Sequence, residues 1–381
     1  MKRLRLNVDS ILPSLTLASS VILSKNTMPI LGCISFESRM EDGHLILDIT
    51  GSDGDIWLTL KVVDGISGDE GISICLDSSD ILKSLRGLAG DEVDMCIDEE
   101  KRKITCKYSN GKFAMPYYDA GEYPKAKFIQ GGTMFLVNSE LIRNAIHFVG
   151  YAAAADELRP VLAGIYMSMS YKTGFSAVAT NAMTLAKYND SSATCDEGFE
   201  NAFILPRKAA NLLYMVTGNT SDAEDICVRY TGNNAEISTS DFKMVSRLID
   251  GNYPNYEAVI PKQFSMNCSF MKSELLAAIR RVLPLGDDSS KMLKFTFGID
   301  EVTIKAEDVE LSTEASEIVA CNYRDEELSI GLNGDSLLSL LKSFDEDVVD
   351  VRMNAQDKPA VFESLKNKGI TKMTLLMPMR I

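Results

Sequence analysis

Long apolar runs, signal sequences and paired cysteines are all missing from this chain of 381 residues. No run of about 18 apolar residues occurs, so we expect no membrane-spanning helix. The opening stretch, Met1–Leu6, lacks the apolar core of a signal peptide. The eight cysteines stand singly, and most interrupt apolar strand-like runs such as Ile74-Cys75-Leu76. This usage predicts buried free thiols in a reducing cytoplasm.

The common signatures of catalysis are also missing. The only two histidines, His44 and His147, lie far apart in the sequence, and no cysteine spacing completes a zinc site. Neither GxGxxG nor GxxxxGK followed by Ser or Thr occurs, so no nucleotide phosphate loop is predicted. The acidic runs 222–225 and 345–347 are typical of solvated turns. We therefore expect no catalytic residue, no cofactor and no metal.

A basic surplus is absent as well. The chain has 39 Lys and Arg against 54 Asp and Glu, which gives a formal charge of −15. Proteins that bind nucleic acid by neutralising phosphates usually carry the opposite balance. A DNA-binding function therefore requires cations that are concentrated in one place within an acidic shell.

What the sequence does contain is an internal repeat. Dipeptides and helical leucines recur at offsets of 126, 130 and 262 residues: Tyr123-Pro124 with Tyr253-Pro254, Met115-Pro116 with Met377-Pro378, and Leu82 with Leu212 and Leu338. Several landmarks that agree on one period predict three units, 1–125, 126–254 and 255–381, each of ordinary domain size.

Each unit has the same predicted order of elements. In the first, Asp9 or Ser10 is the expected cap of a helix over 11–18, with Pro13 in its first turn. A second helix is expected over 79–88, capped by Asp77 or Ser78. Alternating apolar residues predict strands at 45–49, 56–60, 93–97, 103–108 and 112–115. The fold class is therefore α+β, with antiparallel sheets, helices on one side, and two βαβββ halves per unit.

Six short motifs stand in order along the chain: Thr27–Gly32, Arg159–Gly164, Val178–Ala186, Leu205–Ala209, Ser246–Tyr256 and Leu376–Ile381. Together they resemble landmarks of the bacterial DNA polymerase III beta subunits, the sliding clamps, whose "VATDGHRLA" stretch is similar to residues 178–186. The resemblance spans the whole chain. It implies a head-to-tail homodimeric ring of three-domain protomers, with helices lining a central hole and sheets outside. Such a ring is a cytoplasmic processivity subunit without catalytic activity.

The resemblance also implies partners and site residues. The partners are duplex DNA, a second copy of the chain, the polymerase III alpha subunit, the clamp loader and other proteins with clamp-binding motifs, and no membrane. DNA would be faced by the cations Lys25, Lys83, Arg86, Arg143, Arg207, Lys208, Lys272, Arg280, Arg281 and Lys342. Joining the edge strands of the first and third units would close the ring. Phe113 and Met115 would there meet Val282 and Leu283.

A cleft for partner peptides is implied as well. Its lining would be Leu162, Thr180, Ala182, Met183, Leu185, Pro254, Val259, Asn333, Val361, Leu375, Met377, Pro378, Met379 and Arg380. The family commonly has Gly-His-Arg where this chain has Ala182-Met183-Thr184, and often Arg where it has Ala258. The cleft is therefore expected to be less cationic and more apolar. Two other interpretations stay open: an enzyme with a site assembled across domains, and a repeat scaffold that binds only proteins.

Overall fold

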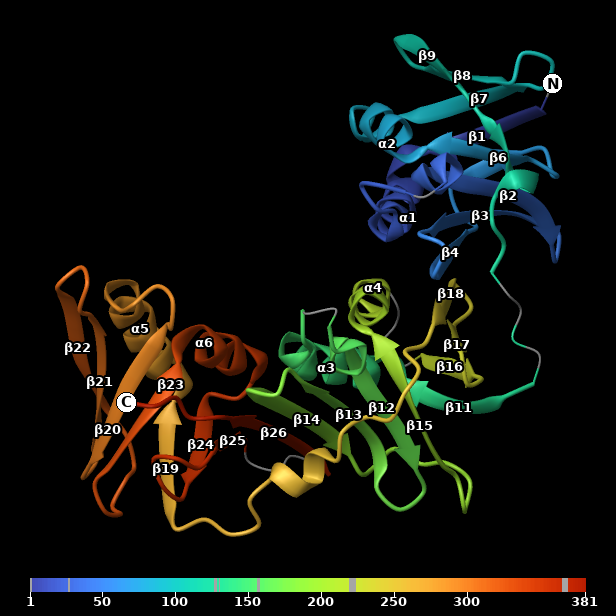
Figure 1. The fold of residues 1–381 in the computed structure, drawn as a ribbon. Coiled ribbons are helices and arrows are strands. Elements are labelled where there is room, and N and C mark those ends of the chain that lie inside the picture. Colours follow the sequence, from blue (N-terminus) through green and yellow to red (C-terminus); the bar gives the residue numbers. More distant parts are fainter. Residues whose placement is uncertain are drawn as a thin grey trace. The chain divides into compact units, whose positions relative to one another are not determined.

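The structure is a computed structural model that describes residues 2–26, 28–126, 129, 131–155, 158–218, 224–364 and 369–381. Thr27, Asp222 and Ala223, named above, lie outside these ranges. The chain forms two compact units (Figure 1), one made of Met1–Glu140 with Asn211–Leu248 and the other of Leu141–Ala210 with Ile249–Ile381.

One pattern, a strand and a helix followed by three strands, occurs six times in the described residues. The first repeat comprises β1 (Lys2–Asn7), α1 (Val8–Val21), β2 (Cys33–Glu41), β3 (His44–Ser52) and β4 (Ile56–Val62), then β6 (Ser73–Asp77), α2 (Ser78–Arg86), β7 (Glu92–Asp98), β8 (Lys103–Tyr108) and β9 (Gly111–Pro116). The short strands β5 (Ile66–Gly68) and β10 (Tyr118–Asp119) are additions to it. The predicted α+β class with βαβββ halves is confirmed.

The other two repeats follow the same order. The second comprises β11 (Thr133–Asn138), α3 (Ser139–Val149), β12 (Gly164–Ser170), β13 (Gly174–Thr180) and β14 (Thr184–Asp190), then β15 (Glu200–Pro206), α4 (Arg207–Thr217), β16 (Asp225–Tyr230), β17 (Asn234–Ser238) and β18 (Phe242–Arg247). The third comprises β19 (Met266–Met271), α5 (Lys272–Val282), β20 (Met292–Gly298), β21 (Glu301–Asp308) and β22 (Thr313–Ala320), then β23 (Leu328–Asn333), α6 (Gly334–Ser343), β24 (Val348–Met353), β25 (Ala360–Glu363) and β26 (Ile370–Leu376).

Four antiparallel sheets carry these strands, two in each unit. The first unit has the orders β5-β1-β7-β8-β9 and β10-β6-β2-β3-β4-β18-β17-β16-β11. The second has β15-β12-β13-β14-β26-β25-β24-β19 and β22-β21-β20-β23. Each long sheet crosses a repeat boundary, because β4 pairs with β18 and β14 pairs with β26. The middle repeat is therefore divided between the two long sheets: β12, β13, β14 and β15 lie in one, and β11, β16, β17 and β18 lie in the other.

Helices form where one stripe of apolar side chains can be buried against a sheet. In α1 the buried stripe is Val8, Ile11, Leu15, Ala18 and Val21. This helix packs against α2, and α5 packs likewise against α6 (Figure 1). The spacing of three and four residues keeps the stripe on one helix face, as an amphipathic helix requires.

The predicted start of the first helix was wrong by three residues. Asn7 is the cap, because its side-chain oxygen accepts a hydrogen bond from the Ser10 backbone N–H at 3.2 Å. Pro13 consequently lies in the helix interior and not in the first turn, so its ring leaves a backbone carbonyl without its usual N–H partner. Asp77 caps α2 as predicted, accepting from the Asp80 N–H at 2.9 Å.

Gly51 on β3 marks the closest approach of sheet and helix in the first unit. A Cβ atom at this position would lie 2.0 Å from the main-chain oxygen of Ala18 on α1. Backbone cannot yield as a side chain would, so we expect Gly51→Ala to lower the free energy of unfolding by about 2 kcal/mol or more. Chemical denaturation measures this loss.

The matched control is Gly232→Ala, where a Cβ atom meets nothing within 4 Å. Its change should stay within about 0.5 kcal/mol. Equal denaturation midpoints for the two variants would contradict the close packing of α1 on β3.

The cysteines and histidines have structural positions in the fold. All eight cysteines are free, and burial raises the pKa of the Cys75 and Cys106 thiols to about 12, so both stay protonated at neutral pH. His44 is the first residue of β3, and His147 is exposed on α3. In the described ranges no three His, Cys, Asp or Glu side chains gather where they could hold a metal ion.

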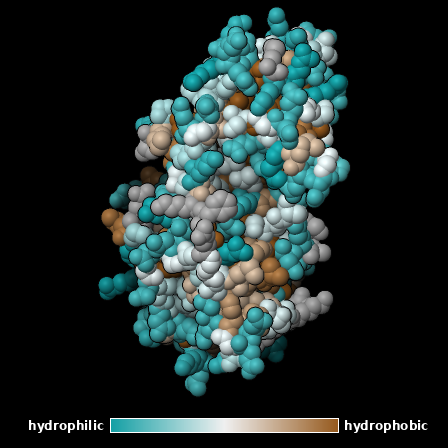
Figure 2. Space-filling view, turned by 90° about the vertical axis from the view of Figure 1, so that its right-hand side faces the viewer, coloured by the Kyte–Doolittle hydropathy of each residue, from teal (hydrophilic) through white to brown (hydrophobic). Residues whose placement is uncertain are grey.

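Hydrophilic side chains dominate the face seen in Figure 2, with apolar side chains between them. Within the part of the chain that the structure describes, none of the helices has both the length and the apolar character that crossing a membrane requires.

Candidate functional site

Four of the predicted cleft residues form one row across neighbouring strands of the second unit. Leu185 on β14 pairs with Thr180 on β13 and with Leu375 on β26, and Leu375 pairs in turn with Val361 on β25. Each of the four is at most 7% exposed. Residues from separate parts of the sequence therefore share one apolar sheet face.

Aromatic side chains flank this row. Tyr253, Tyr256 and Met377 pack against the cluster that contains Leu185. The rings of Tyr166 and Tyr253 are stacked, with centroids 5.1 Å apart, and burial raises the pKa of Tyr256 to about 12. Sequence reasoning missed Tyr166 and Tyr256. Their signal was an aromatic residue beside a predicted cleft position, which is weak without knowledge of strand pairing.

A tight turn joins β13 to β14 at the end of the row. The Thr180 hydroxyl accepts from the Ala182 N–H at 3.1 Å, and the Asn181 side-chain oxygen accepts from the N–H groups of Met183 and Thr184 at 2.9 and 2.8 Å. Ala182 has φ +78°, a conformation that suits the glycine expected there and strains an alanine. The turn leaves Met183 53% exposed and buries Thr184. Because these residues are Met and Thr, neither position carries a cation.

The C-terminal segment lies between this turn and β23. Met377 N–H donates to the Met183 carbonyl at 2.8 Å, and Met379 N–H donates to the Gly331 carbonyl at 2.7 Å. Met377, Pro378 and Met379 are half-buried, whereas Arg380 is exposed. Backbone hydrogen bonds therefore fix the C-terminal segment to the turn at Met377 and to β23 at Met379.

The remaining predicted cleft residues have mixed roles. Asn333 caps α6, accepting from the Ser336 N–H at 2.9 Å, while its amide donates to the Ser290 carbonyl at 3.0 Å. Leu162 is buried in a 3₁₀ turn. Pro254 and Val259 are exposed in the segment that carries Tyr253 and Tyr256.

The predicted DNA-facing cations fall into two groups. Five are exposed, and their side chains make no hydrogen bond or ion pair with any described residue: Lys25, Lys83, Arg86, Arg280 and Lys342. Except for Lys25, which lies in a loop, they stand on α2, α5 and α6, on helix faces away from the buried stripes.

The other predicted cations are half-buried or engaged. Lys272 Nζ donates to the Phe344 carbonyl at the end of α6, at 2.7 Å. Arg281 forms a two-pronged ion pair with Glu317, which raises the arginine pKa. Arg207 donates weakly to the Ala153 carbonyl at 3.4 Å. Arg143 and Lys208 are half-buried.

The predicted interface residues lie near two free sheet ends. Phe113 and Met115 are on β9, the end strand of its sheet. Phe113 is half-buried, and Met115 is 9% exposed. Val282 and Leu283 are 2% and 8% exposed at the end of α5. Ile318, which the sequence does not single out, is 62% exposed on β22, the end strand of another sheet.

Comparison with known proteins gives one consistent family. Models of the N-terminal, central and C-terminal domains of the DNA polymerase III beta subunit match residues 2–127, 136–255 and 257–380. The beta sliding clamps of Staphylococcus aureus and Staphylococcus epidermidis are 24% and 22% identical over 367 residues, which is 94% of this chain and of each relative.

Solved structures agree with the family models on the fold. A sliding clamp from Bartonella birtlesii, bound to griselimycin, is 21% identical with a TM-score of 0.90, and all of both chains is covered. The DNA polymerase III beta subunit of Thermotoga maritima is 22% identical with a TM-score of 0.88, also over all of both chains. Since the three domain models account for nearly the whole sequence, the chain belongs to the DNA polymerase III beta subunit family.

Proposed function

We propose that two copies of this chain close head to tail around duplex DNA and tether the replicative polymerase to it. The family is that of the sliding clamps, which work with DNA and DNA polymerase III as processivity subunits and have no catalytic activity of their own. The proposed place of action is the bacterial cytoplasm.

The strand order of the two long sheets is the observation that carries the ring. In each long sheet, two neighbouring repeats are joined by one pair of strands. The last strand in the first half of one repeat pairs with the last strand in the second half of the next repeat. These pairs are β4 with β18 and β14 with β26. By the same rule β22 and β9 would pair with each other, but each is an end strand that has a partner on one edge only among the described strands. Pairing β22 of one copy with β9 of another continues the rule, and it covers both edges through two equivalent contacts.

The acidic composition is compatible with this function. A closed ring is retained on DNA by topology, so it needs only weak contacts with phosphates. Such contacts fix position without reading sequence. The exposed, unpaired cations Lys83, Arg86, Arg280 and Lys342 are suited to this role because they stand on helices of a chain whose net charge is −15.

Retention on circular and linear DNA tests the proposal. Once a clamp loader has placed the protein on a nicked circular duplex, we expect it to stay bound in salt that abolishes ionic contacts. Linearising the same DNA should release it at once, because a ring slides off a free end. Gel filtration of DNA-bound and free protein measures both states.

Equal retention on the circle and the linear form would contradict encirclement. That result would instead favour direct phosphate binding. A chain that is retained on neither form would be a scaffold for proteins or an enzyme, the two other interpretations of the sequence.

The peptide cleft is the second part of the proposal. The buried row Thr180, Leu185, Leu375 and Val361 would lie beneath it, and the exposed or half-buried Met183, Met377 and Met379 would provide its accessible surface. Methionines adapt to different apolar anchors and suit a surface with several partners. The partners proposed are the polymerase III alpha subunit, the clamp loader and other proteins with clamp-binding motifs.

A further inference from the structure

The turn between β3 and β4 has the same three hydrogen bonds from backbone N–H groups to side chains as the turn between β13 and β14. The Ser52 hydroxyl accepts from the Gly54 N–H at 3.0 Å, and the Asp53 carboxylate accepts from the N–H groups of Asp55 and Ile56 at 3.0 and 2.8 Å. Gly54 has φ +95° where the second turn has its alanine at +78°. Each residue stands 128 positions before its counterpart in the cleft.

The equivalence continues into the sheet, where Trp57 takes the place of Leu185. Trp57 pairs with Val245 across the junction of β4 and β18, as Leu185 pairs with its β26 partner. Arg247 N–H donates to the Asp55 carbonyl at 2.9 Å, which repeats the bond between the tail and the Met183 turn. The first junction thus has the backbone framework of the proposed peptide cleft.

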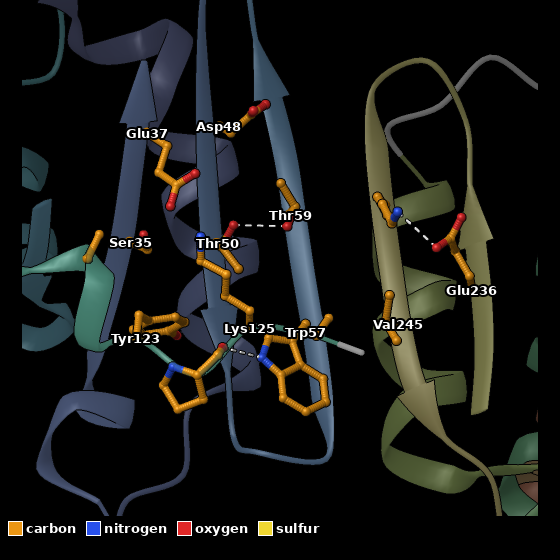
Figure 3. A pocket seen from close by; sticks show the side chains of 14 residues that line it. Ser35, Glu37, Asp48, Thr50, Trp57, Thr59, Tyr123, Lys125, Glu236 and Val245 are labelled. Carbon is orange, nitrogen blue, oxygen red and sulfur yellow. Dashed lines mark hydrogen bonds and ion pairs between the residues drawn. The ribbon is translucent and has the colours of Figure 1, made fainter. Parts of the chain in front are cut away.

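The covering segment is repeated too. Tyr123-Pro124 stands 130 residues before Tyr253-Pro254, and the Trp57 indole N–H donates to the Pro124 carbonyl at 2.8 Å (Figure 3). Two cavities of about 300 and 320 Å³ lie here, and Trp57, Lys125 and Val245 line both. The surface is therefore hollowed at the position that corresponds to the cleft.

The chemistry of this hollow differs from that of the cleft. Apolar positions around the cleft carry charges here, and most of these are paired: Asp55 with Arg247 at 3.3 Å and Glu236 with Lys243 at 2.8 Å. The side chains of Glu37 and Lys125 are exposed and form no hydrogen bond or ion pair with any described residue. Figure 3 places Lys125 beside Trp57 and Glu37 on β2, two strands away from β4, and all three side chains line one of the two cavities. The cavity around Trp57 is therefore lined by one unpaired charge of each sign.

We propose that this hollow, the Trp57 groove (Trp57, Val245, Pro124, Lys125 and Glu37), is a second docking site for short peptide segments of partner proteins. The charge pattern selects a segment with a large apolar anchor, a Lys or Arg that reaches Glu37, and an Asp or Glu that reaches Lys125. The inference rests on the proposed function, because it extends the peptide cleft to its internal counterpart.

Trp57 is the only tryptophan of the chain, so its fluorescence reports directly on the groove. The probes are two acetylated and amidated peptides, Arg-Gly-Leu-Phe-Gly-Asp and the same sequence reversed, added to the full-length protein. We expect a saturable change in emission with at least one of them. An otherwise identical peptide with Ser-Ser in place of Leu-Phe should produce none.

Two variants locate the binding. Glu37→Gln, at an exposed position, should weaken the titration about tenfold, whereas Met183→Glu in the cleft should leave it unchanged. No emission change with either peptide, or a titration that Met183→Glu abolishes and Glu37→Gln does not affect, would overturn the Trp57 groove. The peptide cleft is tested separately, by the affinity of Met183→Glu for a polymerase-derived peptide. A negative result for one site can therefore be distinguished from a negative result for the other.

Discussion

Replacing Ile318 by Asp is expected to halve the mass of the protein in solution, from a dimer of 41.9 kDa chains to single chains. Ile318 is 62% exposed on β22, a free sheet edge that the proposed dimer covers with β9 of the second copy. A carboxylate placed there must be desolvated on association without a partner, which costs several kcal/mol. The dimer dissociation constant should therefore rise at least about a hundredfold. Light scattering after gel filtration measures the mass.

The matched control is Ile299→Asp, which changes an equally apolar and 76% exposed side chain in the turn between β20 and β21 of the same repeat. This variant should remain dimeric. Both side chains are exposed in the single chain, so neither substitution should lower its stability by more than about 0.5 kcal/mol. A dimer that tolerates aspartate at residue 318 would remove β22 from the interface.

Met183→Glu is expected to abolish most binding of a polymerase-derived peptide. Met183 is 53% exposed in the strained turn beside the row of Leu185 and Leu375, and its carbonyl holds Met377 in place. A carboxylate at this point would oppose the burial of an apolar anchor. Hot-spot residues in such sites are worth about 2–4 kcal/mol, which corresponds to a loss of affinity of about 30- to 1000-fold. Fluorescence anisotropy with a labelled peptide gives the dissociation constant.

The choice of Met183 follows from burial. Leu185 is only 3% exposed, so Leu185→Ala would cost about 2–5 kcal/mol of folding stability and confuse the measurement. The control is Met40→Glu, at a 49% exposed methionine on β2. If Met183→Glu bound the peptide as tightly as Met40→Glu, the cleft would have to lie elsewhere.

Local features of the fold were predictable from the sequence because local rules decide them. Apolar alternation and repeat spacing predict the βαβββ order, and Asp77 is one of the two caps that the sequence offers for the second helix. Asn7 was missed because three capping residues follow one another closely, at Asn7, Asp9 and Ser10, and pattern alone does not select among them. The pairings of β4 with β18 and of β14 with β26 join distant segments, so no local pattern reveals them.

The candidate sites show the same division. Family resemblance named Leu185, Leu375 and Val361, and the sheet register brings them into one row. The resemblance did not reveal that the Lys272 side chain donates a hydrogen bond to the Phe344 carbonyl, just after α6, or that Arg281 forms an ion pair with Glu317. Both partners come from other elements. Such contacts depend on tertiary packing and are therefore absent from any single stretch of sequence.

The long sheets also dictate an order of events at the ribosome. β4 ends at residue 62 and its partner β18 begins at residue 242, about 180 residues later. At bacterial synthesis rates of about 5–20 residues per second, the nascent β4 edge waits about 10–40 s for its neighbour. During that interval an unpaired strand is open to intermolecular pairing, against which a charged side chain such as Lys61 is protective. The same delay recurs for β14 and β26, so a pause or truncation in translation would leave one long sheet incomplete and prone to aggregate.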